Sequence, residues 1–261
     1  ALKSGGFVLT QGFIGSTTEN RTTTLGREGS DYSAAIFSHC LDADRMVIWK
    51  DVPGVLTGDP RLFDNVTKLD RLSYREAIEM TYYGASVIHP KTIKPLQNKT
   101  IPMFVKSFLD PEAPGTEISS DVEGIYPPIV VVEKNQSLLH ISTKDYSFVA
   151  EHHLSLLFGV IARHRLFVNS MQNTAISFSV VVPNIPERIE KLIEEISGEF
   201  KVTQESGLEL ITIRHYHEEI INSMRRGKIV LFEERLRDTI QLVVKNVPLM
   251  ERKAVDIPSR K

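Results

Sequence analysis

A polar stretch at residues 21–31, between a strand-like and a helical pattern, constrains the fold of the first half of this chain. It reads Arg-Thr-Thr-Thr-Leu-Gly-Arg-Glu-Gly-Ser-Asp. The apolar run Phe7–Gln11 before it is typical of a strand, and the small and apolar positions after it are spaced as in a helix from Asp31 to Leu41. Ser30 and Asp31 are favoured N-cap residues, so we expect them to cap that helix.

The start of this predicted helix is suited to bind an anion. Free backbone N–H groups and the positive end of the helix dipole favour negative charge there. Arg27 lies just before the predicted cap, and its planar guanidinium can hold a carboxylate or a phosphate with two hydrogen bonds. A capped helix after an ordinary polar loop is the simpler interpretation of the same residues. The residues alone leave both interpretations open.

The composition is that of a soluble globular protein with one large or two to three small domains: 261 residues, 41% hydrophobic and 25% charged. A net charge of −2 gives no indication of a nucleic-acid or anionic-membrane partner. Cys40 is the only cysteine, which excludes an internal disulfide and is typical of a reducing cytoplasm. No apolar run is long enough for a membrane span, and no signal peptide precedes Ala1. We therefore expect a cytoplasmic protein, and we expect the chain to be a fragment because it begins without Met.

Strands and helices alternate through residues 1–125. After the first helix the pattern predicts, in order, Arg45–Trp49 as a strand, Ser73–Tyr83 and Pro90–Gln97 as helices, and Ile101–Lys106 as a strand. This alternation predicts an α/β domain with a parallel sheet covered on both faces. Ligands of such sheets bind at the carboxyl ends of the strands. The loops at residues 11–27 and 51–61 both leave such ends, so we expect them to face one crevice.

The second of these loops contains a carboxylate and an arginine of interest. Asp51 lies where a strand gives way to a Pro-Gly turn, a usual place for a carboxylate that binds magnesium or a ribose hydroxyl. Arg61 follows an Asp-Pro turn and could reach a phosphate. Turn chemistry alone accounts for the same residues and is the simpler interpretation of an isolated Asp-Pro-Arg.

Proline-rich segments at residues 110–115 and 126–128 separate this part from a different pattern, and we place a linker at residues 126–136. Residues 137–205 then follow the order βαββαβ, the ferredoxin-like arrangement. From residue 206 to 261 the same order of strands and helices begins again, but no second helix or last strand is evident before the polar tail. His152, His153 and His164 share one predicted helix, and His215 and His217 share one extended segment. No Cys or close Asp completes a metal-binding set, so we expect no metal site.

Several motifs, in this order and spacing, resemble those of aspartate kinase (aspartokinase): Thr10–Gly15, Arg21–Arg27, Gly29–Tyr32, Asp51–Gly54, Thr57–Arg61 and Gly84–Pro90. The resemblance implies the C-terminal part of a three-layer αβα amino-acid-kinase domain, followed by two ACT regulatory domains. It also implies the reaction, in which MgATP phosphorylates the side-chain carboxylate of L-aspartate to 4-phospho-L-aspartate, in lysine, threonine and methionine biosynthesis.

The resemblance assigns roles around the opening stretch. Asp31 matches the acidic residue that organises the catalytic lysine of the family. Arg27 matches the arginine that holds a substrate carboxylate, and Phe13 and Ser30 match residues that line the aspartate site. These assignments agree with the anion site inferred from the residues themselves.

The nucleotide side of the site departs from the family pattern. Asp51 and Arg61 match nucleotide contacts, but Ser86 stands where the family usually has a lysine that touches nucleotide phosphates. Lys50 stands where a threonine is usual, and Glu28 where a glycine is common. We hypothesise that Lys50 binds the nucleotide phosphate in place of the lysine that is usual at position 86, while a solvent-facing lysine is an equally good interpretation.

Feedback by an amino acid is also implied, with lysine as the first candidate and threonine as the second. In lysine-inhibited relatives the effector lies at a subunit boundary, and the family pairs its ACT regions in a dimer, so we expect a homo-oligomer. Lysine-binding relatives often have glycine at position 151 and aspartate at position 169, whereas this chain has Glu151 and Asn169. We therefore expect an effector site that is present here but binds lysine more weakly. The corresponding positions are Tyr146, Val149, Glu151, His152, His153, Asn169, Asn173 and Thr174.

Two alternatives remain. One is a non-catalytic, amino-acid-binding regulatory subunit of an aspartate kinase, which would not need the kinase motifs of residues 1–107. The other is a fragment of the bifunctional enzyme fused to homoserine dehydrogenase, but no dinucleotide-binding glycine motif follows in this sequence.

We predict that residues 1–261 alone have no useful aspartate kinase activity. The family's Lys-Phe-Gly-Gly motif, whose lysine bridges the transferring phosphate, is not in this sequence. Because positioned charge supplies most of a phosphoryl-transfer rate, its absence should reduce turnover to background. ATP turnover by the purified chain in an aspartate-dependent assay, at a rate typical of kinases, would contradict this.

Overall fold

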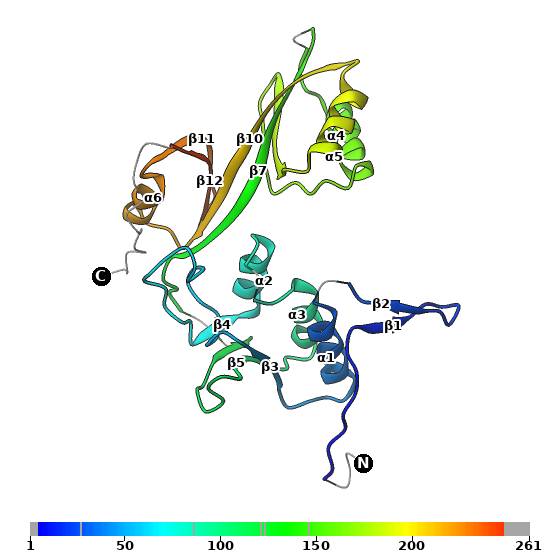
Figure 1. The fold of residues 1–261 in the computed structure, drawn as a ribbon, viewed down its shortest axis with the longest axis vertical. Coiled ribbons are helices and arrows are strands. Elements are labelled where there is room, and N and C mark those ends of the chain that lie inside the picture. The colour runs from blue at the N-terminus through cyan, green and yellow to red at the C-terminus, as the bar shows by residue number, and fades with distance from the viewer. Residues whose placement is uncertain are drawn as a thin grey trace. The chain divides into compact units, whose positions relative to one another are not determined.

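The computed structural model describes residues 5–26, 28–85, 87–120, 122, 124–145 and 147–247 (Figure 1). The chain divides into two compact units. The first contains residues 1–58 and 66–126, and the second contains residues 59–65 and 127–261. None of the helices in the described ranges is long and apolar enough to cross a membrane.

The first unit is built on a four-stranded sheet in the order β3-β5-β6-β4. Its members are β3 (Met46–Lys50), β5 (Met103–Ser107), β6 (Thr116–Ser119) and β4 (Arg71–Ser73). The pairs β3–β5 and β4–β6 are parallel, as the alternating pattern predicts, whereas β5 and β6 form an antiparallel pair. The proline-rich segment 110–115 is therefore the turn between two paired strands.

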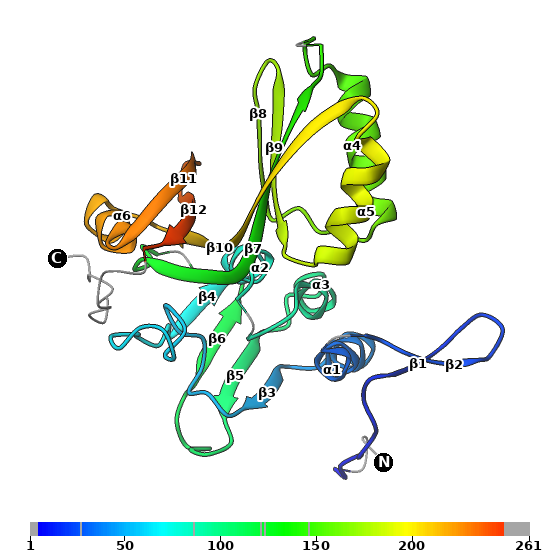
Figure 2. The ribbon, with the colours of Figure 1, turned by 45° about the horizontal axis from the view of Figure 1, so that its top comes forward.

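Three helices accompany this sheet: α1 (Gly29–Cys40), α2 (Tyr74–Tyr82) and α3 (Pro90–Gln97). All three were expected from the sequence. The hydroxyl of Ser73 accepts a hydrogen bond from the Glu76 N–H, which caps α2 as the spacing predicts. These helices lie on one side of the sheet (Figure 2). Within the sheet, the side chains of Leu72, Met103 and Ile118 are fully buried.

Two predictions about the opening stretch are wrong. Helix α1 begins at Gly29, because Glu28 adopts a left-handed conformation (φ 55°) and takes the N-cap position. Ser30 and Asp31 are thus in the first turn and do not cap the helix. The run Phe7–Gln11 is not a strand. Its apolar side chains are exposed, and the paired strands are instead β1 (Ile14–Ser16) and β2 (Thr22–Thr24).

The second unit is built on a six-stranded antiparallel sheet in the order β11-β12-β10-β7-β9-β8. Its two central strands, β7 (Ile129–Thr143) and β10 (Phe200–Arg214), are each fifteen residues long and pair along their whole length. An irregularity in the pairing between Ser206 and Leu210 divides the sheet into two halves.

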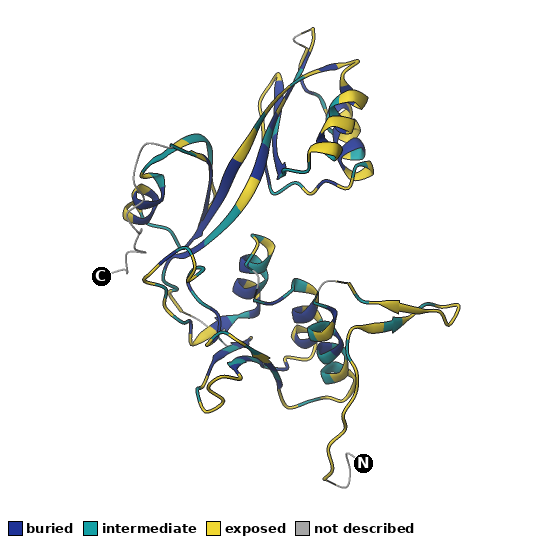
Figure 3. Cartoon of the chain, viewed as in Figure 1, coloured by how far each residue is buried: buried dark blue, intermediate teal, exposed yellow. Residues whose placement is uncertain are grey.

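The first half has the ferredoxin-like order that the sequence predicts. After the second part of β7 come α4 (Glu151–Arg163), β8 (Ser170–Asn173), β9 (Ser177–Pro183), α5 (Pro186–Ile196) and the first part of β10. Both helices turn buried residues toward the sheet and exposed residues away from it (Figure 3). The core between them includes Leu139, Ile141, Leu157, Phe178, Ile189 and Phe200. Each such side chain contributes about 1.5–3 kcal/mol by leaving water.

The second half takes one strand from far away in the sequence. It contains α6 (Glu218–Arg225), β11 (Lys228–Arg235), β12 (Thr239–Asn246) and the second part of β10. The first part of β7 pairs beside β10 and occupies the position of a fourth strand. The linker predicted at residues 126–136 is therefore wrong, because β7 begins at Ile129, whose apolar side chain is buried in the sheet. The predicted polar tail lies outside the described residues.

Glu133, in the first part of β7, makes the stability of the second unit depend on pH. Burial raises the pKa of its carboxyl from 4.5 to about 7. The folded state therefore binds this proton more tightly than the unfolded chain. Stability from this group is complete below about pH 4.5 and is lost as the pH rises through about 7.

We predict that Glu133→Gln has no effect on the free energy of unfolding at pH 4 and raises it at pH 8. The whole pKa shift would correspond to about 3 kcal/mol, but Glu133 is only half-buried, so we expect about 1–2 kcal/mol. Urea denaturation at both pH values measures this, with the exposed Glu190→Gln on α5 as control. An equal effect of Glu133→Gln at pH 4 and pH 8 would contradict it.

Candidate functional site

The loop before α1 is fastened to the first turn of that helix. The Phe13 N–H donates to the Ser33 hydroxyl oxygen (2.9 Å), and the Ser33 hydroxyl donates to the carbonyl of Gly29 (3.0 Å). On the other side, the Leu25 N–H donates to the Phe13 carbonyl (2.9 Å). Phe13 is thereby held in a left-handed conformation, with φ at 74°. Ser33 makes this connection, and no motif in the sequence marks it.

Gly29 permits this close approach. A Cβ atom at position 29 would lie 2.8 Å from Cδ2 of Phe13 and 3.0 Å from Cβ of Leu25. The next residue, Ser30, is exposed. The structure therefore brings Phe13 and Ser30 to the same helix start.

Asp31 and Lys50 form an ion pair at this helix start. Lys50 Nζ lies 2.8 Å from Asp31 Oδ2, and the two side chains are 26% and 16% exposed. Asp31 is in the first turn of α1, where the helix dipole favours a negative charge. Lys50 is the last residue of β3, so the pair lies at the carboxyl end of a parallel strand, where ligands of such sheets bind.

The loop that follows β3 has a fixed shape. At Gly54, φ is 148°, and a Cβ atom there would lie 2.4 Å from the Thr116 hydroxyl oxygen. That oxygen accepts a hydrogen bond from the Val55 N–H (2.9 Å), while the hydroxyl donates to the Leu69 carbonyl (2.6 Å). Asp51, at the start of the loop, is exposed and next to Lys50. Thr116 was not expected from the sequence, because it is far from the loop along the chain.

Arg61 is not brought into this group. Its guanidinium binds the carboxylate of Asp59 through three hydrogen bonds of 2.8–3.2 Å. The same contact lowers the pKa of Asp59. Residues 59–65 group with the second unit. Two further predicted site residues, Arg27 and Ser86, lie outside the described residues.

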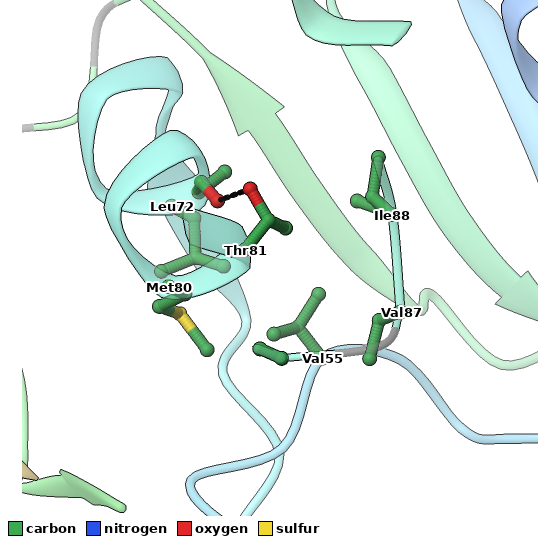
Figure 4. Close-up of a pocket in the computed structure, with 8 residues that line it drawn as sticks. Val55, Leu72, Met80, Thr81, Val87 and Ile88 are labelled. Atoms are coloured by element: carbon green, nitrogen blue, oxygen red, sulfur yellow. Dashed lines mark hydrogen bonds between the residues drawn. The ribbon is translucent and has the colours of Figure 1, made fainter. Parts of the chain in front are cut away.

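A small pocket beside α2 is apolar and carries no obvious chemistry. Its lining is Val55, Leu72, Ala77, Met80, Thr81, Ala85, Val87 and Ile88. The one hydroxyl among them, that of Thr81, donates to the carbonyls of its own helix (Figure 4). Within the described part of the chain there is also no group of three or more His, Cys, Asp or Glu residues that could hold a metal ion.

Two of the predicted effector positions at the start of α4, Val149 and His153, already make hydrogen bonds or ionic contacts within the chain. The Val149 N–H donates to the Ala175 carbonyl (2.8 Å). Nδ1 of the buried His153 accepts from the Ala150 N–H (3.1 Å), so the ring proton is on Nε2, which lies 3.2 Å from Glu199 Oε1. His153 therefore stabilises the helix start. Its neighbours Glu151 and His152 are exposed.

The remaining effector positions lie at opposite ends of β8. Asn169 precedes this strand, and its side-chain amide donates to the Gln136 side-chain carbonyl (3.0 Å). Thr174 follows the strand and forms a turn with Ser177, beside the start of α4. Asn173 is exposed at this end, and Tyr146 lies outside the described residues. In a single chain, Asn169 and Thr174 are thus separated by the length of β8.

Comparison with known proteins agrees with this geometry. The model of the amino acid kinase family matches residues 1–107. The lysine-sensitive aspartokinase 3 of Escherichia coli (strain K12) is 37% identical over 222 residues, which cover 80% of this chain and 48% of the relative. The chain is homologous to the aspartokinases. The bifunctional aspartokinase/homoserine dehydrogenase of Haemophilus influenzae is 36% identical over 209 residues, which cover 78% of this chain and 26% of that protein.

Solved aspartokinase structures also resemble this fold. E. coli aspartokinase III in complex with aspartate and ADP has a TM-score of 0.78 at 31% identity, over 92% of this chain and 57% of that one. The same enzyme in complex with lysine and aspartate has a TM-score of 0.74 at 32% identity. The chain spans about half the length of the E. coli aspartokinase to which it is similar.

Proposed function

We propose that the intact protein that carries this chain is an aspartate kinase of amino-acid biosynthesis, which uses MgATP to phosphorylate L-aspartate. One observation carries the proposal. In a chain homologous to aspartokinases, Phe13 and Ser30, which match substrate-site residues, and Asp31, which matches a catalytic residue, lie at one helix start beside Lys50. The family-model match over residues 1–107 favours this enzyme over a regulatory subunit made of ACT domains alone.

The proposed chemistry needs two anionic substrates to approach each other in line, which fixed positive groups and helix N–H donors make possible. Arg27 would hold a carboxylate of aspartate through its two-pronged guanidinium. Phe13 and Ser30 would shape the site around the aspartate. Mg²⁺ would arrive bound to the phosphates of ATP, since the described residues contain no metal-binding cluster of their own.

The nucleotide would lie on the side of Asp51, Lys50 and Ser86. ADP is bound in the E. coli relative, which supports nucleotide binding here. Lys50 would contact a phosphate, as its position at the end of β3 favours.

We further propose that the two halves of the second unit are ACT domains, which pair in a cytoplasmic homo-oligomer and bind an amino-acid effector. Lysine is the first candidate, because the E. coli relative has been solved with lysine, and threonine is the second. Because Asn169 is separated from Thr174 within one chain, a second subunit would complete the site. Calorimetric titration of the intact protein with both amino acids tests this. Tight lysine binding that survives Asn169→Ala would show that Asn169 is not a ligand.

We predict that Arg27→Ala in the intact protein raises the KM for aspartate roughly 10- to 150-fold. This corresponds to the loss of hydrogen bonds to a charged group, about 1.5–3 kcal/mol. Steady-state kinetics of aspartate-dependent ADP formation measure it. Arg45→Ala is the matched control, because Arg45 is exposed before the other end of β3. An unchanged KM, or equal effects of both variants, would contradict the proposed role, and an inactive wild-type protein would contradict the function.

A further inference from the structure

We propose that Asp31 and Lys50 act as one unit in phosphoryl transfer, with Asp31 as the positioning residue and Lys50 as a catalytic cation. This inference rests on the proposed function. It goes beyond a nucleotide contact, because it assigns Lys50 to the transferring phosphoryl group as a second cation, beside the Lys-Phe-Gly-Gly lysine that the resemblance implies for the intact protein, and makes the action of Lys50 depend on Asp31.

The ion pair leaves the ammonium group of Lys50 able to bind a second anion. A lysine ammonium has three N–H donors and no acceptor. One of these donors makes a hydrogen bond of 2.8 Å to Asp31 Oδ2, which is the hydrogen bond that Lys50 Nζ makes within the described residues. With a side chain 26% exposed, Lys50 can use its other donors on an oxygen that arrives from solvent.

Both members of the pair are held on fixed backbone. Lys50 ends β3, which pairs with β5, and its carbonyl accepts a hydrogen bond from the Phe108 N–H (3.0 Å). Asp31 belongs to the first turn of α1, which Ser33 ties to the loop at Phe13. An ammonium held in this way needs little reorganisation when charge develops on a phosphoryl group, which is the condition for electrostatic catalysis.

The step itself is a direct transfer. A side-chain carboxylate oxygen of aspartate forms a bond to the γ-phosphorus of ATP. The bond between that phosphorus and the β–γ bridging oxygen breaks, and the electron pair leaves with ADP. Lys50 stays protonated throughout and stabilises the equatorial phosphoryl oxygens, while Asp31 keeps the ammonium in place.

A second lysine–aspartate pair near the other end of the same helix provides a matched control. Lys99 binds Asp42, just beyond the end of α1, and also donates to the His39 carbonyl (2.7 Å). The Asp42 side chain is 77% exposed, so this is a surface pair of the kind that contributes little to stability. At a rise of about 1.5 Å per residue, Asp42 is about 16 Å along the helix axis from Asp31.

The test uses the intact protein with Lys50→Met, Lys50→Arg, Asp31→Asn, the double variant of Asp31→Asn with Lys50→Met, and Lys99→Met as control. Lys50→Met should lower kcat roughly 10²- to 10³-fold, as loss of one preorganised donor does, with less than about a 3-fold change in the KM for aspartate. Lys50→Arg should restore part of kcat. The double variant should be no slower than the slower single variant, because the two residues act together.

Three results would overturn the inference: an unchanged or raised kcat in Lys50→Met, an equal loss in Lys99→Met, or multiplicative losses in the double variant. Circular dichroism and thermal unfolding establish that each variant folds. If Lys50→Met does not fold, Lys50→Gln takes its place. An inactive wild-type protein would refute the proposed function, whereas an active wild type with a normal Lys50→Met would refute only this inference.

Discussion

The candidate site depends on the close approach of one loop to the start of α1. Gly29 leaves room for the ring of Phe13, and Ser33 connects the Phe13 backbone to the helix. The left-handed conformation of Phe13 costs about 1–3 kcal/mol, which the surrounding hydrogen bonds and packing offset. Without this contact, the polar stretch would be an ordinary loop. With it, Ser30 and Asp31 lie at a defined position beside the end of β3.

A different constraint governs the second unit. The long strands β7 and β10 run through both halves of one sheet, so neither half has a complete set of strands without them. The second half is completed by the pairing of Ile129 with Arg214, and the whole first half lies between these two residues in the sequence. Such non-local pairing makes the two halves one structural unit.

Local signals in the sequence were sufficient for most helices and for the ferredoxin-like order. Ser73 and Glu76 predicted the start of α2 because a capping box acts within a few residues. The start of α1 was missed because a left-handed glutamate is rare, and the indication that position 28 offers, the glycine common there in the family, was not used. The strand within the predicted linker was missed because its partner, β10, lies far along the chain.

The same distinction applies to the site. The motifs named Phe13, Ser30 and Asp31, and Lys50 was noticed as a departure from the family pattern. The ion pair between Asp31 and Lys50 comes from the fold, since α1 and β3 place them together. Ser33 and Thr116 carry no motif, and their roles follow only from contacts between distant segments. The separation of Asn169 from Thr174 likewise needed the pairing of β8 with β9.

The central claim is that the loop–helix junction at Gly29 binds L-aspartate. Amide hydrogen exchange of the intact protein, with and without saturating L-aspartate, tests it most directly. The account predicts slower exchange at residues 28–34 when aspartate is bound, because the loop and the first turn of α1 close on the ligand, and unchanged exchange in α5. Equal exchange at residues 28–34 in both conditions would contradict it.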